Sequence, residues 1–81
     1  MQKKIRISYY ALLRQERGLA EETITSEATT VRELYQELKA RHTFKLSEAQ
    51  IKASINSKIA SWDTPINEGD NVLLIPPVAG G

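Results

Sequence analysis

The residues best suited to chemistry in this 81-residue chain are the last six, Pro76-Pro77-Val78-Ala79-Gly80-Gly81. Two prolines cannot continue a central strand and favour an extended path, so we expect an arm that leaves the domain body. Gly80 and Gly81 have no side chains, and such an arm can enter a narrow channel that any Cβ would block. The free carboxylate of Gly81 would then lie at the tip of the arm. A frayed terminus of small residues is the simple alternative.

Few other residues suit ordinary catalysis. The chain has no cysteine, which excludes a disulfide framework, a thiolate zinc site and a thiol nucleophile. Its single histidine, His42, has no partner ligands in the sequence pattern, so we predict no metal site. Asp63 and Asp70 fall in expected turns, where short carboxylates usually accept from backbone donors. We therefore predict a protein that is not catalytic alone.

Composition and charge narrow the class of partner. With 41% apolar and 26% charged residues, the chain has the composition of one folded domain. Eleven Lys and Arg against ten Asp and Glu leave a net charge of +1, which gives no general attraction to nucleic acid or to anionic lipid. The sequence also lacks a long apolar run and a signal-peptide core. We expect a cytoplasmic protein that binds neither nucleic acid nor membranes.

The sequence pattern predicts the elements that would carry the arm. Alternation over residues 3–10 indicates a strand with Ile5, Ile7 and Tyr9 toward the core. Residues 11–17 suit one or two helical turns or a compact loop that ends at Gly18. Residues 22–25 are rich in β-branched side chains, and this favours a second strand beside the first.

A helix should follow from Thr30, where Thr30-Val31-Arg32-Glu33 matches a capping box. Helical spacing then places four side chains on one face, up to an end near His42. Those four are Val31, Leu34, Tyr35 and Leu38.

Residues 51–60 indicate a short hairpin that turns at Asn56-Ser57, and the turn over residues 67–70 precedes a last strand over 71–75. The main order, strand-strand-helix-strand-strand, allows the helix to cover one face of the sheet and leaves the other open.

The last strand is apolar on both of its faces. We predict that Val72 and Leu74 point toward the helix, while Leu73 and Ile75 point toward the open face. On the same face we expect Lys4, Arg6, Ser8 and Tyr10, counted by twos along the first strand. An apolar patch left exposed on a small domain often marks an interface.

Several segments resemble those of a known family, the small, ubiquitin-like subunits of molybdopterin synthase, which are sulfur carriers. The most specific segment is the terminal Pro-Pro-Val-Ala-Gly-Gly of residues 76–81. The others are Tyr9-Tyr10-Ala11-Leu12-Leu13-Arg14, Thr30-Val31, Ala53-Ser54-Ile55-Asn56, Pro65-Ile66 and Glu68-Gly69-Asp70. Tyr9-Tyr10 stands where some members have Phe-Phe, a minor departure.

The resemblance implies an α+β fold of the β-grasp type, a mixed sheet covered by a helix over residues 1–75, with an extended tail over 76–81. It implies that a ubiquitin-activating-like adenylyltransferase uses ATP to adenylate Gly81, and that the chain itself binds no cofactor. Sulfur then replaces AMP, and the thiocarboxylate, preceded by Gly80, supplies sulfur to cyclic pyranopterin monophosphate to form the dithiolene of molybdopterin. The expected assembly is a heterotetramer with the large subunit.

The residues expected to bind that subunit combine the open sheet face with the tail. They are Tyr10, Arg14, Ile59, Leu73, Ile75, Pro76, Pro77, Val78 and Ala79. Two alternatives stay open at this point. The same chemistry could supply sulfur for thiamine or for tRNA thiolation, and a β-grasp module could bind a partner without any activation of its tail.

Overall fold

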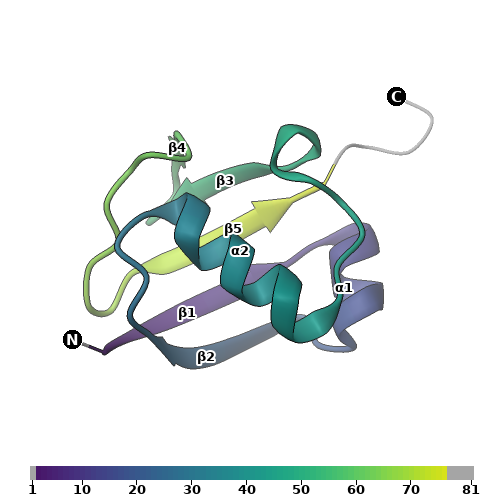
Figure 1. The fold of residues 1–81 in the computed structure, drawn as a ribbon, viewed down its shortest axis with the longest axis horizontal. Helices are drawn as coiled ribbons and strands as arrows, with labels where there is room; N and C mark the ends of the chain where they lie inside the picture. The colour runs from purple at the N-terminus through teal and green to yellow at the C-terminus, as the bar shows by residue number, and fades with distance from the viewer. Residues whose placement is uncertain (1, 77–81) are drawn as a thin grey trace.

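A computed structural model describes residues 2–76 of the chain. Its described elements are five strands, two α-helices and one 3-10 turn (Figure 1). In chain order they are β1 (Lys3–Tyr9), α1 (Ala11–Arg17), β2 (Glu21–Ser26), α2 (Val31–His42), the 3-10 turn η1 (Glu48–Gln50), β3 (Lys52–Ile55), β4 (Lys58–Ala60) and β5 (Asn71–Ile75).

The five strands form one mixed sheet in the order β2-β1-β5-β3-β4. Strands β1 and β5 run parallel at its centre, and the other neighbours are antiparallel. Figure 1 shows α2 lying across one face of this sheet. The arrangement is a β-grasp fold, as the family resemblance implied. The hairpin strand β4 adds a short fifth strand at one edge.

The core lies between the sheet and α2. Ile5, Ile7 and Tyr9 of β1 are buried there, and the predicted helix face meets them from the other side. All four predicted side chains of that face are buried: Val31, Leu34, Tyr35 and Leu38. The apolar alternation of β1 and the helical spacing of α2 were therefore interpreted correctly, because both elements bury one face in the same core.

The N-terminus of α2 differs from the predicted capping box in one half. The Thr30 hydroxyl accepts from the backbone N–H of Glu33 at 3.2 Å, as expected. The Glu33 carboxylate, however, accepts from the N–H and the hydroxyl of Thr29, each at 2.8 Å. The two donors of Thr29 converge on one carboxylate oxygen, so this acid bonds one residue further back than the motif predicts.

The hairpin between β3 and β4 helps to fix where β5 begins. Asn56 and Ser57 both have positive φ, +51° and +74°, as a two-residue primed turn requires. The Asn56 side chain donates to the Asp70 carboxylate and accepts from the N–H of Asn71, both at 3.0 Å. The turn is thus tied to the first residue of β5, and this bond helps set the register of the last strand.

Candidate functional site

Strand β5 has the orientation that we hypothesised for it. Val72 and Leu74 are fully buried beneath α2, whereas Leu73 and Ile75 point to the other face and are half-buried. The register with β1 and β3 decides this, because it pairs Val72 with Ile7 and Leu74 with Ala53. The apolar side chains of Leu73 and Ile75 therefore belong to the open face of the sheet.

The strand pairings bring residues distant in the sequence into one row on the open face. Ser8 pairs with Leu73, Leu73 with Ser54, and Ser54 with Ile59. Ile59 is 76% exposed on the edge strand β4. The small Ser54 lies between these two apolar side chains, so Leu73 and Ile59 form the middle and the rim of one surface.

Helix α1 adds the remaining predicted residues. Tyr10 is its N-cap and is 49% exposed, and Arg14 is exposed on the helix itself. The helix is held to the domain by Leu13, which is fully buried, and it ends at Gly18, whose φ of +82° gives a left-handed C-cap. We call Tyr10, Ile59, Leu73 and Ile75 the apolar patch, with Arg14 at its rim.

Of the tail residues predicted to bind the partner, only Pro76 lies within the described residues. Pro76 is buried, so in this chain alone its ring is not open to a partner. A partner-binding role for it stays a prediction. The predicted site residues Pro77, Val78, Ala79, Gly80 and Gly81 lie outside the described residues. What the structure supplies is the strand that leads to them and the patch beside that strand.

Sequence reasoning missed a polar network that fixes α1 to the sheet. Arg17 of α1 donates to both carboxylate oxygens of Glu22 on β2, at 2.8 and 2.9 Å. The hydroxyl of Tyr9 donates to the same carboxylate at 2.6 Å, and the His42 ring lies 3.7 Å from it. The sequence shows only a core tyrosine, a strand acid and a helix-end arginine, and no spacing rule joins them.

These contacts shift the pKa values of the titratable groups in the network. Hydrogen bonds from Arg17 lower the pKa of Glu22 to about 2, with a further contribution from Tyr9. Burial lowers the pKa of His42, and the nearby Arg17 adds to this. Burial and the Glu22 carboxylate raise the pKa of Tyr9. At neutral pH the network is therefore a carboxylate held between a guanidinium and a phenol, which is a structural clamp.

We expect Glu22→Gln to lower the free energy of unfolding by about 2 kcal/mol at pH 7, because a charge-assisted, partly buried pair is lost. The folded-state pKa of Glu22 lies below its unfolded value, so this contribution is present above about pH 4.5. It should disappear as the pH falls toward 2. Urea unfolding of both proteins across this range measures the difference.

The matched control is the neighbouring Glu21→Gln, since Glu21 pairs with Arg6 where both side chains are more than half exposed. This change should alter stability by less than about 1 kcal/mol. A difference between wild type and Glu22→Gln that stayed constant from pH 7 to pH 2 would contradict the clamp.

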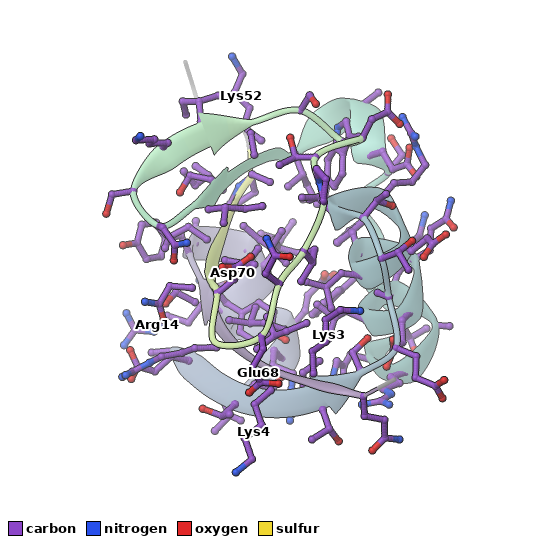
Figure 2. All side chains as sticks on the ribbon, turned by 90° about the vertical axis from the view of Figure 1, so that its left-hand side faces the viewer. Lys3, Lys4, Arg14, Lys52, Glu68 and Asp70 are labelled. Carbon is purple, nitrogen blue, oxygen red and sulfur yellow. The ribbon has the colours of Figure 1, made fainter. Side chains whose placement is uncertain are left out.

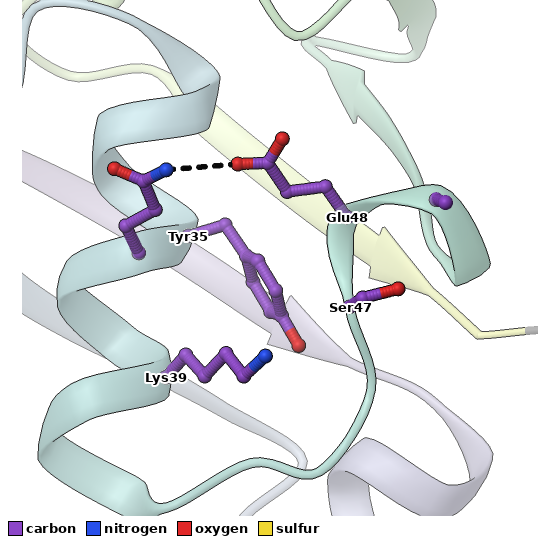
Figure 3. A pocket seen from close by; sticks show the side chains of 6 residues that line it. Tyr35, Lys39, Ser47 and Glu48 are labelled. Atoms are coloured by element: carbon purple, nitrogen blue, oxygen red, sulfur yellow. Dashed lines mark hydrogen bonds between the residues drawn. The ribbon is translucent and has the colours of Figure 1, made fainter.

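A pocket of about 380 Å³ lies elsewhere, between α2 and η1 (Figure 3). Gln36 donates to Glu48 across it at 3.0 Å, and the Tyr35 hydroxyl already donates to the carbonyl of Leu46. Burial raises the pKa of Tyr35 to about 12, so its phenol stays protonated and is no nucleophile. The other lining residues are Lys39, Ser47 and Ala49. This pocket has no arrangement suited to catalysis and lies apart from the patch.

Residues 2–76 contain neither a cluster of metal ligands nor a membrane-spanning helix. No three His, Asp or Glu side chains in this range gather closely enough to hold a metal ion. No helix in the same range is long and apolar enough to cross a membrane.

Comparison with known sequences assigns the family. The sequence model of the ThiS family matches residues 7–81, which is nearly the whole chain and includes the tail. The chain belongs to the ThiS family. A curated relative, the molybdopterin synthase sulfur carrier subunit of Escherichia coli, is 30% identical over 80 residues. The match covers 95% of this chain and 99% of that relative.

Solved structures agree with this ThiS-family assignment. A protein described as molybdopterin converting factor subunit 1 of Pyrococcus furiosus is 32% identical and superposes with a TM-score of 0.77. The match covers 94% of this chain and 99% of that one. A chain from a complex of subunits 1 and 2 of molybdopterin-converting factor from Helicobacter pylori is 23% identical and superposes with a TM-score of 0.63. The match covers 100% of each of the two chains. At that identity the likeness shows the β-grasp fold alone.

Proposed function

We propose that this protein is the sulfur-carrier subunit of a molybdopterin synthase. The observation that carries the proposal is the similarity to the Escherichia coli sulfur carrier subunit over 95% of the chain. The Gly80-Gly81 end and the apolar patch beside β5 support it, because a carrier needs a modifiable terminus and a surface that presents it.

The proposed chemistry takes place at the carboxylate of Gly81. A carboxylate is a poor electrophile, so an adenylyltransferase of the ubiquitin-activating type first uses ATP. A carboxylate oxygen attacks the α-phosphorus, pyrophosphate leaves, and an acyl-adenylate forms. A sulfur nucleophile then attacks the carbonyl carbon and AMP leaves, so that the C–O bond to phosphate is replaced by a C–S bond. The thiocarboxylate carries one sulfur atom in place of one oxygen.

The proposed second stage takes place in the large subunit of the synthase. Gly80 and Gly81 enter its active site, and two thiocarboxylate-bearing chains in succession each transfer one sulfur atom to cyclic pyranopterin monophosphate, because the molybdopterin dithiolene contains two. Water takes the place of each transferred sulfur at the carbonyl carbon, so Gly81 leaves as a carboxylate. The acid–base groups of both stages belong to the partners. In this scheme the present chain is both a substrate and a docking subunit, and it acts in the cytoplasm.

Intact mass spectrometry after co-expression with the host's adenylyltransferase and a sulfur source tests the first stage. We expect a mass increase equal to the exchange of one oxygen for sulfur, mapped to the C-terminal peptide. A chain that is never adenylated or thiolated would contradict the carrier function and favour a non-covalent binding module.

Adding the host's large subunit and cyclic pyranopterin monophosphate to the thiolated chain tests the second stage. We expect molybdopterin to form. A chain that is thiolated yet yields none, while it restores thiamine synthesis or tRNA thiolation in carrier-deficient cells, would assign the same chemistry to a different product.

A further inference from the structure

The charges of the open sheet face are strongly biased toward one sign. Among the strand residues 2–76 that point away from α2, the only carboxylate is Glu21, and it is paired with Arg6. Lys4 on β1 and Lys52 on β3 are exposed on the same face, and neither forms an ion pair within residues 2–76. Arg14 at the rim of the patch is likewise exposed without an ion pair in this range.

Several carboxylates on the α2 side of the sheet also form ion pairs with arginines. Glu37 pairs with Arg41 at 2.7 Å, and Glu48 pairs with Arg32 at 3.2 Å. Asp63 also pairs with Arg32. The net charge of +1 therefore does not describe the open face, where Lys4, Lys52 and Arg14 lack an ion pair within residues 2–76 and the one strand carboxylate is already paired. Lys39 and Lys45, on the α2 side, also lack an ion pair in this range, so the open face is set apart by its shortage of acids.

Two of these cations, Lys52 and Arg14, lie beside the apolar patch, and Lys4 lies further along the same face. Lys52 is the direct cross-strand partner of Ile75, at the end of β5 from which the chain continues into the tail. Arg14 belongs to α1, which follows the end of β1 that lies beside the same end of β5. Lys4 is at the other end of β1, opposite Thr25. Figure 2 shows Arg14 on the side of the sheet opposite α2, with Lys52 near the top of the view and Lys4 near the bottom.

A partner that covers the patch must also face these cations. Burying an unpaired ammonium against an apolar or basic surface costs free energy, whereas a carboxylate within reach recovers it. We propose that the partner's docking surface is apolar at its centre and acidic at its rim, and that Lys52 is the specificity contact that meets this acidic rim next to the tail. The inference rests on the proposed function, because it concerns the large subunit that would cover this face.

The expected signature is electrostatic steering. Stopped-flow association of the chain with the host's large subunit should slow as the ionic strength rises, since exposed charges are screened over about 10 Å at 0.1 M salt. Lys52→Glu should reduce the association rate constant roughly three- to tenfold at low salt and flatten its salt dependence. Lys4→Glu should act in the same direction.

The matched control is Lys45→Glu in the loop that joins α2 to η1. It makes the same change in net charge at an exposed lysine that also has no ion pair within residues 2–76. This control should leave the association rate and its salt dependence near those of the wild type. Thermal melts of all variants check that the fold is intact.

The possible results separate this inference from the proposed function. Binding of the wild type with equal rates for Lys52→Glu and Lys45→Glu, or faster association of Lys52→Glu, overturns the acidic rim and leaves the proposed function standing. No binding of the wild-type chain to the large subunit contradicts the proposed function and the inference together.

Discussion

Deletion of Gly81 should abolish both the acyl-adenylate and the thiocarboxylate while the domain stays folded. The shortened chain still ends in a carboxylate, that of Gly80, but this group falls one residue short, about 3.5 Å in an extended chain. A displacement of that size is enough to remove a reacting group from attack distance, which spans only a few tenths of an ångström. Intact mass after incubation with the adenylyltransferase, ATP and a sulfur source measures the loss.

Deletion of Ala79 is the control that separates the length of the tail from the identity of its last two residues. It shortens the tail by one residue and keeps the Gly-Gly end. If reach is decisive, this variant should fail as completely as the Gly81 deletion, and both should melt like the wild type. Normal thiocarboxylate formation by either shortened chain would refute the argument that the carboxylate must be delivered to a fixed position.

The open face shows which structural details the sequence could and could not predict. Alternation in β1 and helical spacing in α2 predict their buried faces, because each has a polar side to contrast with an apolar one. In β5, residues 72–75 are all apolar, so the pattern of that strand favours neither orientation. The prediction for Val72 and Leu74 was correct, but only the register with β1 and β3 establishes it.

Contacts between distant segments account for what the sequence did not predict. Nothing local relates Tyr9 and Arg17 to Glu22, and the clamp exists because β1, α1 and β2 meet at one end of the sheet. Likewise, the sequence indicates only that Lys52 is an exposed strand residue. The pairing of Lys52 with Ile75 shows that it lies beside the start of the tail. The chemistry proposed for Gly81 rests on the residue type at the tip of the tail and on the family resemblance, and it stays a prediction.

The second large effect concerns Ile75, the patch residue nearest the tail. Interfaces concentrate their affinity in a few central apolar side chains, so a carboxylate in place of Ile75 should weaken binding to the large subunit by at least about 2 kcal/mol, roughly 30-fold. The monomer should remain folded, because Ile75 faces away from α2. Titration calorimetry with Ile75→Asp, beside a thermal melt, measures both quantities.

The control is Thr25→Asp, which places the same charge on the same face of the sheet but outside the patch. The two positions are matched, since Thr25 lies opposite Lys4 and Ile75 lies opposite Lys52. Each new carboxylate therefore has a lysine across the strand. The two variants differ in the apolar contact, lost only at Ile75, and in the neighbouring lysine, which is Lys52 beside the tail or Lys4 away from it. If Ile75→Asp bound as tightly as Thr25→Asp, the large subunit would have to dock on another face.

Leu74→Asp, which buries its charge in the core, should instead unfold the domain whether or not a partner is present.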